Sequence, residues 1–179
     1  MSIFAIGDLH LPGGDKKPMD VFGAHWEHHF ERICADWQNR VQEEDIVLIP
    51  GDISWAMQLS DALCDLREIA KMPGRILLLR GNHDFWWSSV SQLRSCLPAK
   101  MHAVQNDAYD AGECVFCGTR GWTIPLTANA TAQDEKLYRR EALRLEMSLK
   151  DARRIAGSRP IFAMMHYPPL LPETMRQGT

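Results

Sequence analysis

No hydrophobic run in this sequence approaches the roughly 20 apolar residues that a helix needs to cross a bilayer. Residues 1–6 are also too short for the hydrophobic region of a secretion signal. An excess of positive charge is missing as well, because the formal net charge is −3 and the pI is about 6.1. We therefore expect a cytoplasmic protein that binds neither a membrane nor extended nucleic acid. Binding of small anionic substrates is compatible with this net charge.

Cysteine is scarce and irregularly spaced. The five cysteines form an odd set without the spacing of a disulfide framework, so reduced thiols are expected. Cys114 and Cys117 form a C-x-x-C pair, but their neighbours read as a strand, where residues three apart point to opposite faces. Two packed cysteines are favoured over a redox or zinc site.

Internal repeats, low-complexity tracts and linkers are also lacking. A chain of 179 residues can bury roughly 70% of the surface that its unfolded form exposes. We expect a single domain over residues 1–179 with its own hydrophobic core.

The sequence contains several short apolar runs, each of which is followed by an Asp or a His. Residues 76–79 are four large apolar residues between Pro73-Gly74 and Gly81, which is typical of a strand covered on both faces. Residues 3–6, 46–49 and 161–165 follow the same pattern. If the four strands are parallel neighbours, their carboxyl ends bring one set of polar side chains to one sheet edge: Asp8, His10, Asp52, Asn82, His83 and His166. Oxygen and imidazole groups gathered in this way predict a metal centre.

The segments between these apolar runs show the periodicity of helices. Apolar stripes predict helices over residues 26–41, 60–70, 88–96 and 138–156, the second beginning with Ser60 as N-cap and the last ending at Gly157. Weaker strands over 101–104 and 114–118, with a turn at 107–112, are expected to start a second sheet. His25 and His29 lie four apart and could share a metal, although a partly solvated helix face is the alternative.

The order of these motifs resembles the calcineurin-like metallophosphoesterase family: Asp8-x-His10, Gly51-Asp52, Gly81-Asn82-His83-Asp84 and a lone His166 after a strand. Residues 118–122 are similar to a bacterial branch described as predicted phosphohydrolases. The resemblance implies an α/β fold, an α/β/β/α sandwich of two mixed sheets flanked by helices. The family closes its site with a Gly-His-x-His element that this sequence lacks. We therefore expect a C-terminally truncated domain without its last strands, whose exposed sheet edge could pair with a second copy to form a homo-oligomer.

The resemblance also implies a function. It indicates a metal-dependent phosphoesterase that hydrolyses a phosphate mono- or diester of a small phosphorylated substrate through a binuclear centre and a bridging hydroxide. Asp52 would bridge two divalent ions, with Asp8 and His10 on one and Asn82 and His166 on the other. This donor set suits Mn, Fe or Zn better than Ca.

Four further residues complete the expected site. By resemblance, His83 does not bind metal but protonates the leaving oxygen or supports the developing charge, and Asp84 would fix its tautomer. Arg120 could hold a phosphate oxygen. Trp86, or its neighbour Trp87, could stack on a substrate, although core packing is the alternative. Because the last motif is absent, the competing hypothesis is a catalytically weak or inactive metal- or nucleotide-binding module of the same fold.

Overall fold

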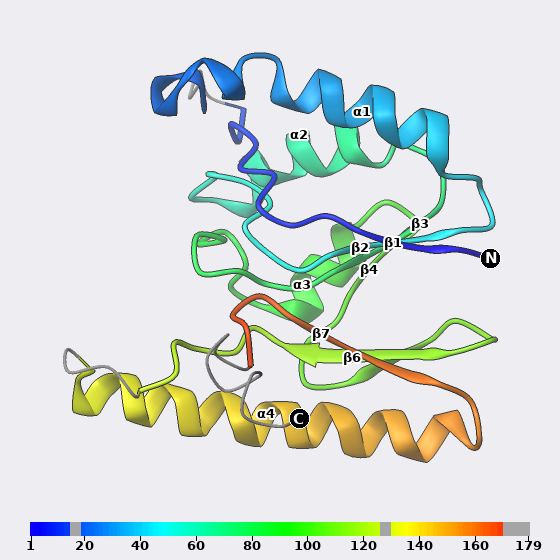
Figure 1. The fold of residues 1–179 in the computed structure, drawn as a ribbon, viewed down its shortest axis with the longest axis vertical. Coiled ribbons are helices and arrows are strands. Elements are labelled where there is room, and N and C mark those ends of the chain that lie inside the picture. Colours follow the sequence, from blue (N-terminus) through cyan, green and yellow to red (C-terminus); the bar gives the residue numbers. More distant parts are fainter. Residues whose placement is uncertain (15–18, 126–129, 170–179) are drawn as a thin grey trace, which may run out of the picture. The chain divides into compact units, whose positions relative to one another are not determined.

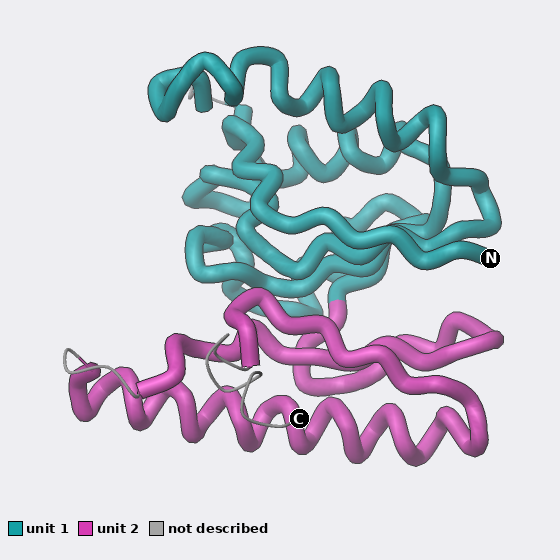
Figure 2. The backbone as a smooth tube through the Cα atoms, in the orientation of Figure 1, with its two compact units in different colours: residues 1–103 teal, residues 104–179 magenta. Residues whose placement is uncertain are grey.

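The structure is a computed structural model that describes residues 1–14, 19–125 and 130–169. The chain forms two compact units, residues 1–103 and 104–179, shown in different colours in Figure 2. Each unit has its own sheet. The single domain expected over residues 1–179 stays a prediction.

Unit 1 is built on a parallel sheet of four strands: β1 (Ile3–Ala5), β2 (Ile46–Ile49), β3 (Arg75–Leu78) and β4 (Met101–Ala103). The strands lie in chain order, with Ile3 opposite Ile46, Ile46 opposite Arg75, and Ile76 opposite Met101. Because all four run in the same direction, their carboxyl ends share one edge of the sheet.

The helices of unit 1 are α1 (His29–Arg40), α2 (Leu59–Ile69) and α3 (Val90–Cys96), with short 3-10 turns η1 (Met19–Phe22) and η2 (Ala24–Trp26) before α1. Helices α1 and α2 lie on the same face of the sheet (Figure 1). Their apolar stripes pack on the strands around fully buried residues that include Leu66, Ile69, Ile49 and Ile76. This burial is the main force that holds the strand ends in place.

Unit 2 contains a mixed sheet of β5 (Ala108–Asp110), β6 (Val115–Thr119) and β7 (Ile161–Met165), in which β6 is antiparallel to β5 and parallel to β7. The long helix α4 (Ala132–Ala156) packs along this sheet. Thr131 and Asp134 form a capping box at its start, and Gly157, with a φ of 59°, ends it. The expected role of Gly157 is confirmed.

The two neighbouring cysteines of unit 2 are packed, free thiols, as predicted. Cys114 and Cys117 are both buried. Burial also raises the pKa of the Cys117 thiol, so the thiolate that redox and zinc chemistry require is disfavoured.

The expected fold class, α/β with two sheets and flanking helices, is confirmed, but four local expectations are wrong. Strand β4 was expected to begin the second sheet and instead extends the first, which is wholly parallel in the described residues. Strand β7 joins the second sheet rather than the first. The expected turn at 107–112 contains β5, and α2 begins at Leu59, so Ser60 is not its N-cap. Strand pairing depends on distant partners, which local patterns do not reveal.

No helix within the described residues is long and apolar enough to span a membrane.

Candidate metal centre

The pairing of β1 with β2 continues beyond both strands into the loops that follow them. The backbone N–H of Asp8 donates to the carbonyl of Gly51 at 3.1 Å, and that of His10 donates to the carbonyl of Asp52 at 3.0 Å. The N–H of Leu11 donates to Ile53 at 3.0 Å, and the N–H of Trp55 donates back to Leu11 at 2.8 Å. This ladder holds Asp8 and His10 beside Asp52.

Three potential ligands therefore converge at the end of the sheet. Nε2 of His10 lies 3.7 Å from Oδ1 of Asp8 and 3.9 Å from Oδ2 of Asp52. Potential ligand atoms of all three residues lie within 4.8 Å of one another. The Asp8 side chain is 61% exposed, whereas those of His10 and Asp52 are 14% and 4% exposed. Of the three side chains, that of Asp8 is the most open to solvent.

These distances suit a shared cation better than direct hydrogen bonds. At 3.7 and 3.9 Å the atoms are too far apart to bond to each other well. Two ligand atoms that each lie about 2.0–2.2 Å from one Zn²⁺ ion are at most about 4.4 Å apart, so both measured distances fit. The donor set also fits, because carboxylate oxygen and imidazole nitrogen are both ligands of transition metals.

The backbone is strained at each of the three residues. Asp8, His10 and Asp52 have φ values of 57°, 47° and 51°, in the left-handed region that side chains other than glycine rarely adopt. Each such residue costs on the order of 1–3 kcal/mol and persists only where its surroundings hold it. The ladder between the two loops provides this support. Strain at three converging polar residues is typical of a functional site.

Asp84 is the buried anchor of the site. Its carboxylate has no solvent exposure and accepts five N–H groups. Four come from the backbone and one from an indole: Gly81, Asp52, Ile53, Ser54 and Nε1 of Trp86. Burial raises the pKa of the Asp84 carboxyl, while the backbone donors act against this rise. Asp84 therefore fastens the loop after β2 to the loop after β3.

This set of partners corrects the role expected for Asp84. Within the described residues its carboxylate makes no hydrogen bond to the His83 ring, whose tautomer we expected it to fix. The sequence places the two side by side, but successive side chains in this turn point to different partners. Asp84 acts through the backbone around Asp52 instead.

The loop after β3 approaches Asp52 so closely that only glycine fits at one position. A Cβ on Gly81 would lie 2.1 Å from Oδ1 of Asp52 and 2.2 Å from its backbone nitrogen. Two residues later, the backbone N–H of His83 donates to Oδ1 of Asp52 at 2.9 Å. Asn82 lies between these two contacts, next to the bridging carboxylate that the sequence predicts.

The His83 ring faces the same group of side chains. Its centroid lies 5.9 Å from that of His10, at an interplanar angle of 64°. Trp55 touches both rings, because it stacks on His10 at 4.8 Å and lies 4.7 Å from His83. Trp55 was not among the site residues predicted from the sequence. Its position three residues after Asp52 was the available signal.

Comparison with known proteins decides the family of this site. The sequence profile of the family described as calcineurin-like phosphoesterase matches residues 1–177. The chain belongs to the calcineurin-like phosphoesterase family. No curated protein was found to match it. A solved structure of a protein of unknown function from Aquifex aeolicus is similar at 15% identity and a TM-score of 0.49, covering 92% of this chain and 90% of that one.

Two of the site residues predicted from the sequence lie in unit 2. His166 follows β7, and its backbone N–H donates to the carbonyl of Arg120 at 3.2 Å. The guanidinium of Arg120 lies 4.0 Å from Oε1 of the buried Glu141 and 4.7 Å from the ring centroid of Trp122. The predicted roles of His166 as a ligand and of Arg120 as a phosphate contact stay predictions.

Trp86 is placed differently from what the sequence suggested for a substrate contact. It is 2% exposed, and its indole N–H donates to Oδ1 of Asp84 at 3.2 Å. Trp87 is 1% exposed and packs 5.5 Å from it in the same core. Both rings belong to the hydrophobic core, so the alternative of core packing holds, and the expectation that Trp86 stacks on a substrate is corrected.

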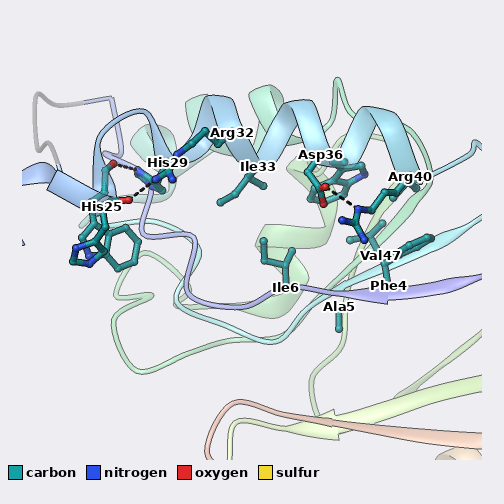
Figure 3. Close-up of a pocket in the computed structure, with 13 residues that line it drawn as sticks. Phe4, Ala5, Ile6, His25, His29, Arg32, Ile33, Asp36, Arg40 and Val47 are labelled. Carbon is teal, nitrogen blue, oxygen red and sulfur yellow. Dashed lines mark hydrogen bonds and ion pairs between the residues drawn. The ribbon is translucent and has the colours of Figure 1, made fainter. Parts of the chain in front are cut away.

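A separate cavity of about 460 Å³ lies between α1 and strands β1 and β2 (Figure 3). None of the predicted metal ligands lines it. His29, at one end, has Nε2 2.9 Å from the Leu9 carbonyl and Nδ1 3.2 Å from the Trp26 carbonyl. Since both nitrogens face carbonyl oxygens, His29 is not arranged to share a metal with His25. It tethers α1 to the loop that carries Asp8 and His10.

Proposed function

We propose that this chain is a phosphoesterase that hydrolyses a phosphate mono- or diester at a centre of two divalent metal ions. The observation that carries the proposal is the convergence of Asp8, His10 and Asp52 at the end of a parallel sheet, in a chain of the calcineurin-like phosphoesterase family. Strain at all three residues adds support.

The arrangement of the Asp52 carboxylate supports a bridging role. Its Oδ2 is directed toward His10, at 3.9 Å, while its Oδ1 is directed toward the loop after β3, where it accepts the His83 N–H. We assign one ion to Asp8, His10 and Asp52, and the second to Asp52 and Asn82, all of which lie in unit 1. Mn, Fe and Zn are the metals that suit these donors. Ions bound there would neutralise charge on the phosphoryl oxygens and supply a nucleophile from water at neutral pH.

The protein's own side chains orient the ester and supply the proton. We assign proton donation to the leaving oxygen to His83, and the position of its ring beside His10, only partly buried, supports this role. Proton donation of this kind contributes typically about 10²- to 10⁴-fold to the rate. Asp84 accepts the Asp52 N–H, and Asp52 accepts the His83 N–H, so these contacts hold Asp52 and His83 beside each other.

The test is metal-dependent hydrolysis of p-nitrophenyl phosphate and of bis(p-nitrophenyl) phosphate, which separates monoesterase from diesterase activity. Purified protein is stripped with a chelator and reloaded with Mn²⁺, Fe²⁺ or Zn²⁺. Asp52→Asn should abolish turnover. Asp61→Asn, the same change at an exposed position on α2, should leave it at the wild-type level.

Two results would overturn the proposal. Turnover no higher than that of the metal in buffer, in protein shown by elemental analysis to hold metal, would identify a binding module rather than an enzyme. Full activity in Asp52→Asn would mean that the reaction takes place elsewhere in the molecule.

A further inference from the structure

Four rings form a chain of contacts that starts at the candidate metal centre. His10 stacks on Trp55 at 4.8 Å, Trp55 lies 4.7 Å from His83, and His83 lies 6.3 Å from Phe85 at an interplanar angle of 82°. This series of ring contacts begins at His10, a predicted metal ligand, and ends at Phe85, whose ring is 52% exposed.

Phe85 is exposed although its two neighbours are not. In the run Phe85-Trp86-Trp87, the two indoles are 2% and 1% exposed. The turn is held from both sides, because the Trp86 indole donates to Asp84 and the Phe85 N–H donates to the His83 carbonyl at 2.8 Å. These contacts keep the Phe85 ring beside His83 and in contact with solvent, where burial of a benzyl group would otherwise be favourable.

This position determines what Phe85 can touch during the proposed reaction. A residue that protonates the leaving oxygen must lie within hydrogen-bond reach of it. The alcohol part of the ester therefore lies next to His83. Of the two rings beside His83 in the contact series, Trp55 is partly buried and stacked on His10, whereas Phe85 is exposed. A flat ring on that alcohol could stack on Phe85, which an aliphatic chain could not do.

We propose that this site prefers phosphate esters whose alcohol carries an aromatic ring, and that Phe85 is the residue that selects them. The inference rests on the proposed function. Both nucleoside phosphates and simple arylmethyl phosphates have this chemistry, and the test separates them.

The test compares two matched substrate pairs on metal-loaded wild-type protein. Benzyl phosphate and cyclohexylmethyl phosphate are both esters of primary alcohols of similar size, and only one is aromatic. Adenosine 5′-monophosphate and ribose 5-phosphate differ by the base. We expect kcat/KM to favour the aromatic member of at least one pair by roughly 2- to 13-fold, the range that aromatic pairing adds beyond burial. A preference in only one of the two pairs shows whether the favoured ring is a nucleoside base or a simple aryl group.

Variants assign the preference to one residue. Phe85→Leu keeps an apolar side chain but removes the ring, and should bring the ratio within the preferred pair close to one. Phe85→Tyr keeps the ring and should preserve the ratio. The control is Phe22→Leu, the same change at a side chain in η1 that is 64% exposed and makes no ring contact with the four rings in the described residues, and it should also preserve the ratio.

The outcomes separate the role of Phe85 from the proposed phosphoesterase activity. Equal kcat/KM within both pairs, or a ratio that survives Phe85→Leu, would overturn the role of Phe85 while leaving a phosphoesterase intact. If no ester is hydrolysed, calorimetric titration with benzylphosphonate and cyclohexylmethylphosphonate still decides. Tighter binding of the aromatic phosphonate that is lost in Phe85→Leu supports the stacking site, and equal binding refutes it.

Discussion

Replacing Asp84 by Asn is the sharpest test of how the metal centre is held together. The change keeps the size of the side chain, removes its charge and replaces one acceptor oxygen by an NH₂ donor. In the wild-type structure Oδ2 accepts two N–H groups and Oδ1 accepts three. The single amide oxygen of asparagine can accept only one of these two sets of N–H groups.

The expected cost follows from that count. Whichever way the amide turns, at least two buried N–H groups lose their acceptor and face another donor. A buried donor left unsatisfied costs about 1–3 kcal/mol, so Asp84→Asn should lower the free energy of unfolding by about 2–6 kcal/mol. Natural domains have only about 5–15 kcal/mol in total, so the expected loss is a large fraction of the stability.

Urea unfolding of the metal-free proteins at neutral pH measures this difference. Asp65→Asn is the matched control, because Asp65 is also a buried carboxylate, at 6% exposure. Both of its hydrogen bonds go to Oδ2, from the Gly13 N–H at 2.7 Å and the Ser54 hydroxyl at 2.5 Å. The amide oxygen of asparagine can accept both, so this variant should lose less than about 1 kcal/mol.

A clear result would refute the reasoning. If Asp84→Asn unfolds within about 0.5 kcal/mol of the wild type, Asp84 does not fasten the two loops as an acceptor of five bonds. If stability is unchanged but turnover is lost, the original expectation that Asp84 orients His83 would be restored.

Three further predictions address the same unit. Gly81→Ala places its Cβ 2.1 Å from Oδ1 of Asp52 and should cost about 1–3 kcal/mol and weaken metal binding in calorimetric titration, whereas Gly7→Ala, whose nearest contact is 3.5 Å, should be tolerated. His83→Ala should keep the wild-type metal content by elemental analysis while turnover falls about 10²- to 10⁴-fold; loss of the metal would make His83 a ligand. Burial raises the pKa of Asp65, so the folded protein binds this proton more tightly than the unfolded chain. The stability of Asp65→Asn relative to wild type should therefore increase as the pH rises from below the ordinary value of about 3.9 to neutrality, and a difference independent of pH would contradict this cause.

Local sequence patterns were sufficient for most of the elements. Apolar runs of four or five residues predicted β1, β2, β3 and β7, because a strand buried on both faces needs an unbroken apolar stretch. The period of the last helix and its terminal glycine predicted the C-terminal half of α4 and its end at Gly157. Each signal lies within a few residues of the structure it predicts.

The candidate site was partly predictable for a related reason. Asp8, His10 and Asp52 follow strands that are immediate neighbours, so the parallel sheet brings them together once the strands are recognised. The part played by Asp84 was not predictable, since its five donors come from two loops that are about 30 residues apart in the chain. Trp55 and Phe85 were overlooked because no residue pattern reports which rings are neighbours or which remain exposed.

The sequence by itself determined where the strands end and which residues follow them, since apolar runs and turn residues act over short distances. Only the tertiary structure decided that β4 completes the first sheet, that β7 belongs to the second, and that Asp84 binds the backbone rather than His83. These choices depend on hydrogen bonds and burial between segments that are far apart in the chain. The free energy of such contacts depends on the whole arrangement of the segments and not on neighbouring residues alone.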